Sequence, residues 1–174
     1  MPFYQKLGDI PPKRHTQFRQ ENGELYHEQL FGTIGFVGMS SLLYHRQRPT
    51  QVLEVLGSED VRPMAAVERN LLSRKLDGWA VKPGKDWLSS RVPTLFNSDC
   101  TVALAAPPKV ERDDIYKNAD QDEVVFVHRG EGVLETMFGQ IAFGPGDYLV
   151  IPRGVMHRFK WTTDDNRALI VESA

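Results

Sequence analysis

The chain has 174 residues, of which 41% are hydrophobic and 25% are charged, and its formal net charge is −2. This length is enough for one domain with a core, or for one domain with a long extension. The small net charge gives no electrostatic reason to expect a nucleic acid or a membrane surface as a partner. The single cysteine, Cys100, excludes an internal disulfide, and no apolar run approaches the length of a transmembrane helix. We therefore expect a cytoplasmic protein.

Residues 1–98 have an irregular texture, with scattered prolines and short β-rich runs at residues 35–39 and 51–56. Residues 64–76 carry apolar side chains at roughly helical spacing, but the stretch is short and stays ambiguous between helix and strand. We expect residues 1–98 to form an N-terminal extension with short strands, which packs on a domain formed by residues 99–174.

From Cys100 onward, short runs rich in Val, Ile, Phe and Thr alternate with Gly, Pro, Asn and Asp, a pattern typical of strands and tight turns. A hairpin is expected around Gly139, and a second turn at residues 144–147. The expected strands are residues 101–106, 123–128, 132–138, 140–143, 148–151, 158–162 and 168–171. Closely spaced strands without helices between them favour an antiparallel sandwich or barrel.

The stretch 122–157 resembles the cupin superfamily, whose fold is a double-stranded β-helix, or jelly-roll barrel. The first cupin motif runs His-x-His, three or four residues, Glu, six residues, Gly. The second runs Gly, five residues, Pro-x-Gly, two residues, His, three residues, Asn. This resemblance implies a mainly β, cupin-type barrel behind the irregular extension. The matching residues are Glu123 and Gly130 in the first motif, and Gly146, Pro152, Gly154 and His157 in the second.

The sequence departs from the cupin pattern where the metal ligands would stand. The His-x-His pair falls on Tyr116 and Asn118, or on Lys117 and Ala119, depending on the gap, and Trp161 replaces the closing Asn. A non-haem Fe(II) site uses two His and one carboxylate, so this barrel lacks one His. His128 does not replace it, because a residue five positions from Glu123 on the same strand points to the opposite face.

Glu123 and His157 have a structural interpretation and a functional one. In the first, Glu123 is a partly exposed carboxylate paired with Arg153 or Arg158, and His157 donates a hydrogen bond to a backbone carbonyl. In the second, they are vestigial metal ligands that His15, His27 or His45 completes. We favour the first. We thus assign no catalytic, cofactor-binding or metal-binding residue, and treat Gly130, Gly146, Pro152 and Gly154 as fold-motif residues.

The order of several N-terminal elements is similar to the start of the homogentisate 1,2-dioxygenase family, and the likeness extends over essentially the whole chain. The residues that carry it are Gly8-Asp9-Ile10-Pro11, Lys13-Arg14-His15-Thr16, Tyr26, Glu28, Leu30-Phe31-Gly32, Ser40-Ser41-Leu42-Leu43-Tyr44-His45 and Phe96-Asn97-Ser98-Asp99. The resemblance implies a two-cupin, homo-oligomeric enzyme that cleaves the aromatic ring of homogentisate to maleylacetoacetate with Fe(II) and O2, in tyrosine and phenylalanine breakdown. Its iron ligands belong to the C-terminal half.

The resemblance thus implies that this chain is the non-metal N-terminal part of such an enzyme, with a scaffold and oligomer role and no cofactor of its own. Its partner is then the C-terminal catalytic cupin half, which is missing from this chain. Whether the chain acts as an enzyme by itself stays open. Two alternatives remain: a stand-alone non-metal cupin that binds a small molecule or a partner, or a small metallocupin that uses Glu123 and His157.

Overall fold

The computed structural model describes residues 17–67, 70, 72–109 and 114–173. The chain divides into two compact units, Met1–Glu59 and Asp60–Ala174. This division lies well before residues 98 and 99, where the change from irregular sequence to regular strand patterns suggested a boundary. The reason is that residues 91–96 form a strand within the main sheet of the second unit. Within the described part of the chain, no helix has the length and apolar character needed to cross a membrane.

The first unit contains an antiparallel hairpin of two strands, β1 (His27–Gly32) and β2 (Ser40–His45), in which His27 lies opposite His45. Residues 35–39, which were expected to form a strand, instead belong to the turn of this hairpin. Gly35 and Gly38 adopt positive φ angles of 59° and 85°, which glycine tolerates and strand residues do not. Residues 51–56 form no strand either.

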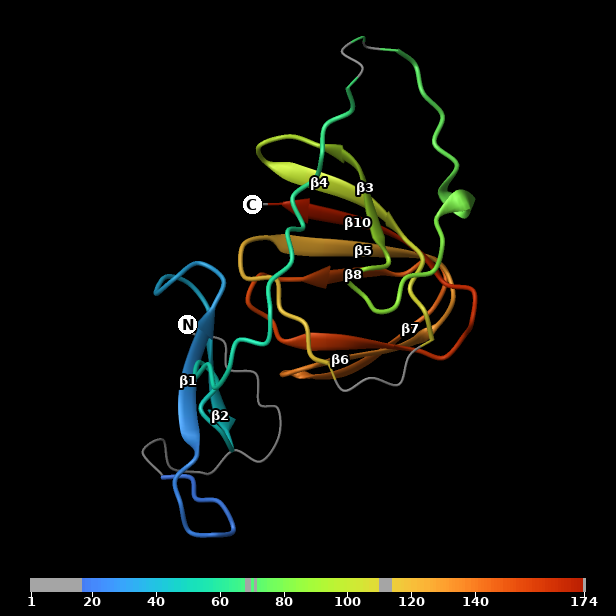
Figure 1. Ribbon diagram of the computed structural model, residues 1–174. Helices are drawn as coiled ribbons and strands as arrows, with labels where there is room; N and C mark the ends of the chain where they lie inside the picture. Colours follow the sequence, from blue (N-terminus) through green and yellow to red (C-terminus); the bar gives the residue numbers. More distant parts are fainter. Residues whose placement is uncertain (1–16, 68–69, 71, 110–113, 174) are drawn as a thin grey trace. The chain divides into compact units, whose positions relative to one another are not determined.

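The second unit has a five-stranded and a three-stranded antiparallel sheet, stacked in Figure 1. The first has the order β3-β4-β10-β5-β8 and the second the order β7-β6-β9. The strands are β3 (Arg91–Phe96), β4 (Cys100–Ala105), β5 (Asp122–Arg129), β6 (Gly132–Thr136), β7 (Gly139–Phe143), β8 (Tyr148–Ile151), β9 (His157–Trp161) and β10 (Arg167–Ser173). This is the jelly-roll architecture that the sequence predicted.

Every strand expected after Cys100 is present, with ends that differ by at most two residues. Strand β3 was not expected, because Pro93 interrupts its pattern. Proline is tolerated here since β3 is an edge strand, and the register shifts between Pro93 and Leu95. Residues 64–76 form neither helix nor strand where they are described, and the following 3₁₀ turn, η1, spans Gly78–Ala80.

The core follows the two-residue period of the strands. On β5, Glu123, Val125 and Val127 are buried while the residues between them are partly exposed. The three-stranded sheet contributes Leu134 and a group of aromatic side chains, Phe143, Phe159 and Trp161, whose rings contact one another.

Glycines in left-handed conformations fix the turns that close the barrel. Gly130, between β5 and β6, has a φ of 100°, and a Cβ atom there would lie 2.2 Å from Asn166 Oδ1. Gly146 has a φ of 96° in the turn before β8. After β8, the Gly154 amide donates a hydrogen bond of 2.7 Å to the Asn118 carbonyl. This last contact holds residues 116–118 against the barrel end that carries His157.

Candidate functional site

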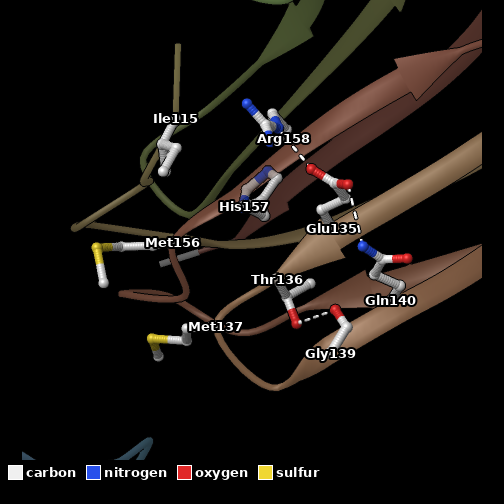
Figure 2. A pocket seen from close by; sticks show the side chains of 9 residues that line it. All are labelled: Ile115, Glu135, Thr136, Met137, Gly139, Gln140, Met156, His157 and Arg158. Atoms are coloured by element: carbon white, nitrogen blue, oxygen red, sulfur yellow. Dashed lines mark hydrogen bonds and ion pairs between the residues drawn. The ribbon is translucent and has the colours of Figure 1, made fainter. Parts of the chain in front are cut away.

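A surface pocket of about 430 Å³ lies beside the β6–β7 turn (Figure 2). It is lined by Ile115, Glu135, Thr136, Met137, Gly139, Gln140, Met156, His157 and Arg158. The Glu135 carboxylate accepts from Arg158 Nε at 2.6 Å and from Lys160 Nζ at 2.8 Å, and these two bonds lower its pKa. Its negative charge is therefore already compensated. The His157 side chain is fully buried, so the pocket does not expose the imidazole.

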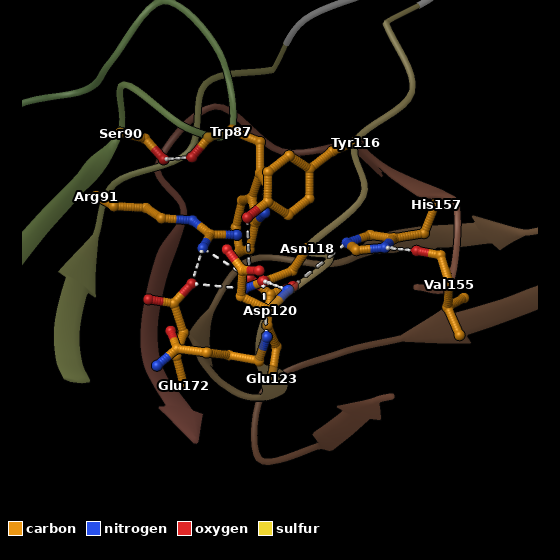
Figure 3. Close-up of polar contacts among 11 residues, drawn as sticks. Trp87, Ser90, Arg91, Tyr116, Asn118, Asp120, Glu123, Val155, His157 and Glu172 are labelled. Atoms are coloured by element: carbon orange, nitrogen blue, oxygen red, sulfur yellow. Dashed lines mark hydrogen bonds and ion pairs between the residues drawn. The ribbon is translucent and has the colours of Figure 1, made fainter. Parts of the chain in front are cut away.

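The chemistry-bearing residues gather inside the barrel, around the guanidinium of Arg91 (Figure 3). Arg91 Nη1 lies 2.7 Å from Glu123 Oε1 and 2.8 Å from Glu172 Oε1. The two glutamates face each other across the β5–β10 pairing. The side chains of Arg91 and Glu123 are 7% and 0% exposed, so this is a buried charge cluster.

Aromatic and amide side chains complete the surroundings of the guanidinium. Arg91 lies over the ring of Trp87, 4.5 Å from its centroid, and 5.0 Å from that of Tyr116, which are cation–π distances. The Tyr116 hydroxyl donates to Glu123 Oε1 at 3.4 Å, and Asn118 Nδ2 donates to Glu172 Oε1 at 3.2 Å. Burial raises the pKa of Tyr116 to about 12, so this hydroxyl stays protonated.

His157 points at the same cluster from β9. Because a carbonyl oxygen can only accept, His157 Nδ1 donates to the Val155 carbonyl at 3.0 Å. Its other nitrogen, Nε2, lies 3.6 Å from Glu123 Oε2, and neither atom has a hydrogen-bond partner among the residues that the structure describes. Burial lowers the pKa of His157 and favours the neutral imidazole. A lone pair on Nε2 then faces a carboxylate oxygen.

The cluster holds one obligate cation and two carboxyl groups. Burial is the largest effect on Glu172 and raises the pKa of this group, while the positive charge of Arg91 opposes that shift. Glu172 is therefore the carboxyl group that takes up a proton more readily than usual, while Arg91 Nη1 contacts both carboxyl groups at nearly equal distances. A buried charge without such compensation would be strongly unfavourable.

The structure corrects the expected surroundings of Glu123. Glu123 is fully buried rather than partly exposed, and its ion pair is with Arg91. The two arginines that the sequence suggested pair elsewhere: Arg153 with Asp122 at 3.5 Å, and Arg158 with Glu135 at 2.6 Å. The expected contact of His157 with a backbone carbonyl is confirmed.

The structure also separates two alternatives that the sequence left open. Tyr116 and Asn118, rather than Lys117 and Ala119, point at the carboxylates from the positions of the His-x-His pair. His128 is exposed and lies on the opposite face from Glu123, as expected. His15 lies outside the described residues, and His45 bonds Gln29 within the β1–β2 hairpin.

Sequence reasoning missed Arg91 and Glu172. Arg91 lies in a segment that looked like an irregular extension, and Glu172 lies at the end of an apolar strand. One signal was available. Glu123 alternates with Val125 and Val127 on the inward face of a strand, and a carboxylate there requires a buried cation.

The site does not fit the iron centre that cupin metal sites provide. Glu123 Oε1 already binds the guanidinium, and Tyr116 and Asn118 stand at the positions of two imidazoles, so His157 is the single imidazole of the described cluster. In the described residues, no three His, Cys, Asp or Glu side chains are grouped as a metal site. One imidazole falls short of a two-His, one-carboxylate triad.

A family model for the cupin domain matches residues 107–172, the span that contains this cluster from Tyr116 to Glu172. The chain contains a cupin domain. A protein of Saccharolobus solfataricus named "Putative dioxygenase SSO1533" is 35% identical over 158 residues, which cover 90% of this chain and 41% of that protein. This chain therefore spans less than half the length of that protein.

Two solved structures resemble part of the chain. A cupin-2 domain protein from Shewanella frigidimarina is 25% identical, with a TM-score of 0.42 over 52% of this chain and 84% of that chain. The structure of KdgF from Halomonas sp. is 18% identical, with a TM-score of 0.44 over 48% and 77% of the two chains.

Proposed function

We propose that this chain is the structural, non-metal cupin part of a two-cupin dioxygenase of the homogentisate 1,2-dioxygenase type. In this role it supplies scaffold and oligomer contacts in a cytoplasmic enzyme. The Fe(II) and the ring-cleaving chemistry reside in a separate C-terminal cupin half. The 35% identity to a protein named as a dioxygenase supports the dioxygenase part of this proposal. The homogentisate part follows from the resemblance of the N-terminal residues.

The observation that carries the non-metal role is the position of Arg91. Its guanidinium binds both carboxylates of the cluster, at 2.7 and 2.8 Å, beside His157. A divalent ion about 4 Å from this fixed positive charge would be repelled by roughly 8 kcal/mol at an effective dielectric constant of 20. The arginine thus supplies internally the positive charge that a metal would supply, and stabilises the barrel without it.

Metal analysis of the purified 174-residue chain tests this role. After anaerobic incubation with Fe(II) and removal of free metal, we expect far less than one equivalent of iron, with the same content in the His157→Ala variant. With homogentisate and Fe(II), we expect no O2 consumption above the protein-free rate. Stoichiometric iron that disappears in His157→Ala would contradict the proposal and favour a metallocupin.

A gain-of-binding variant makes the test sharper. Combining Tyr116→His and Asn118→His with Arg91→Met installs the His-x-His pair and removes the competing cation. We expect this triple variant to bind about one equivalent of Zn²⁺ or Fe(II) by calorimetry, because four donors then converge. The matched control keeps Arg91 and carries only the two histidines, and it should bind at least tenfold more weakly. Equal binding by both would show that Arg91 does not exclude the metal.

A second candidate is a stand-alone module that binds a small molecule at the pocket beside the β6–β7 turn. Its volume of about 430 Å³ is within the usual range for small-molecule sites, and Ile115, Met137 and Met156 give it apolar walls. A fragment screen by NMR distinguishes the two functions. Shifts that centre on Met137 and Met156, and vanish in Met137→Glu, would support the module.

A further inference from the structure

Several buried polar atoms of the Arg91 cluster have no hydrogen-bond partner among the residues that the structure describes (Figure 3). The donors are Nε and Nη2 of Arg91 and Nε1 of Trp87, and the acceptors are Oε2 of Glu123 and Nε2 of His157. Protein interiors leave few buried polar atoms unpaired, because each unpaired atom lowers the stability of the fold. A concentration of such atoms around one guanidinium points to a bound partner.

The two acceptors face each other between β5 and β9. His157 Nδ1 donates to the Val155 carbonyl, so Nε2 carries the lone pair of the neutral imidazole. Nε2 and Glu123 Oε2 lie 3.6 Å apart, and both side chains are 0% exposed. Two acceptors at this distance repel each other unless hydrogen atoms lie between them. An oxygen atom about 2.8 Å from each of them can donate one hydrogen to each.

The donors belong to Arg91 and to the ring beneath it. Arg91 Nη1 contacts Glu123 and Glu172, whereas Nε and Nη2 are adjacent N–H groups of the kind that bind a pair of oxygen atoms. The guanidinium lies 4.5 Å from the centroid of the Trp87 ring, whose own N–H is a further donor. The same cluster therefore needs a partner that accepts at one end and donates at the other.

Charge decides the chemical class of that partner. Arg91 already faces two carboxyl groups, so a further anion would be repelled by Glu123 and Glu172. A cation would lie beside the fixed charge of Arg91, and an ammonium ion has no lone pair that could accept from this residue. An apolar molecule would leave the donors and acceptors unpaired. A neutral hydroxyl group both donates and accepts, which is the combination that the cluster requires.

We propose that the barrel binds neutral hydroxyl groups at this cluster, an inference that rests on the non-metal role proposed above. One or two oxygen atoms donate to Glu123 Oε2 and His157 Nε2, and others accept from Arg91 and Trp87. Water supplies this chemistry because one molecule carries two hydrogens, and adjacent hydroxyl groups of a small polyol supply it equally. Trp87 and Tyr116 are partly exposed, so the cluster borders on solvent and either source can reach it.

A high-resolution crystal structure of the full chain, grown without added polyols, tests the proposal. We expect electron density at hydrogen-bond distance from both Glu123 Oε2 and His157 Nε2, and further density beside Arg91 Nε or Nη2. Separate peaks identify water. Connected density, together with a solute that mass spectrometry detects after denaturation, identifies a polyol. A lack of density between Glu123 and His157 would overturn the proposal.

Anomalous scattering at the iron absorption edge separates this test from that of the proposed function. Density between Glu123 and His157 that carries an iron signal would contradict both the hydroxyl site and the non-metal role. A site without density and without an iron signal would contradict the hydroxyl site alone.

Nuclear Overhauser effects in solution provide a measurement that needs no crystal. The indole proton of Trp87 should show a cross-peak to a long-lived water or hydroxyl, whereas that of Trp79, which is 52% exposed, should contact only rapidly exchanging solvent. Equal behaviour of the two indoles would contradict the proposal. This comparison uses the wild type, so it stands even where a variant fails to fold.

A variant of His157 tests the bridging position itself. His157→Phe keeps an aromatic ring but removes the second acceptor, and we expect it to lose the density beside Glu123 Oε2. The matched control is Met156→Leu, at the neighbouring residue that lines the surface pocket, and it should keep this density. The same density in His157→Phe would show that His157 does not hold the hydroxyl group, and would overturn the proposal.

Discussion

In both sheets of the barrel, successive side chains alternate between the inside and the outside. The two sheets place their charged side chains on opposite sides. The three-stranded sheet turns Leu134, Phe159 and Trp161 inward, while Glu135 and Lys160 on its other side form an ion pair that water reaches. The five-stranded sheet does the reverse at its charged end. Arg91, Glu123 and Glu172 point inward, while apolar residues such as Leu104, Leu169 and Phe126 point outward.

This difference indicates what the charged side chains of each sheet require from their surroundings. A sheet with polar residues outside needs only water there, so the three-stranded sheet can remain at the surface. The inward carboxylates of the five-stranded sheet require a compensating cation. Arg91 supplies this cation within the chain.

Loss of the internal cation should have the largest effect. Arg91→Met leaves the inward carboxyl groups of Glu123 and Glu172 without their cation, and we expect a loss of about 3–5 kcal/mol in the free energy of unfolding, measured with urea. The matched control, Arg158→Met, breaks the ion pair of the three-stranded sheet with Glu135, and it should cost much less because solvent reaches that pair.

Adding Glu123→Gln and Glu172→Gln to Arg91→Met should recover most of the lost stability, because the buried negative charges are then gone. If Arg91→Met and Arg158→Met lost equal amounts of unfolding free energy, the inward ion pairs of the five-stranded sheet would matter no more than the outer pair of the three-stranded sheet.

The turn that joins the two sheets should give the next largest effect. Gly130→Ala forces a φ of 100° on an L-residue and places its Cβ atom 2.2 Å from Asn166 Oδ1. We expect a loss of about 1–3 kcal/mol by thermal or urea unfolding. Gly144→Ala, which meets nothing within 4 Å, is the control and should change stability by less than about 0.5 kcal/mol. Similar losses of unfolding free energy for Gly130→Ala and Gly144→Ala would show that the turn at Gly130 is not tightly constrained.

The smallest effect should come from pH. Burial lowers the pKa of His157 below its ordinary value of 6.5, so below that pH the unfolded chain binds a proton that the folded chain resists. The contribution of neutral His157 is therefore complete above pH 6.5 and is lost as the pH falls toward the folded-state pKa. The slope is at most about 1.4 kcal/mol per pH unit.

His157→Gln cannot titrate, so its unfolding free energy should vary less between pH 7 and pH 5 than that of the wild type. Glu172, whose raised pKa acts in the opposite direction at lower pH, is present in both proteins and cancels in the comparison. The same slope in both would show that His157 is not held neutral.

Local patterns in the sequence identified much of the barrel. The strands after Cys100 and the turns at Gly139 and Gly146 were predictable because the alternation of side chains and the φ of glycine are local properties. For the same reason the absence of the His-x-His pair could be read directly. The prediction of strands at residues 35–39 and 51–56 was wrong, because β-propensity without a pairing partner does not make a strand.

The charged cluster could not be predicted in this way, because it depends on pairings far apart in the chain. Arg91 bonds a glutamate 81 residues away, and its strand contains Pro93, which only an edge position tolerates. The sequence by itself thus determined the strands after Cys100 and the absence of the His-x-His pair, because both are local patterns. Tertiary structure alone decided which arginine meets the inward carboxylates, since strand order and register bring distant residues together.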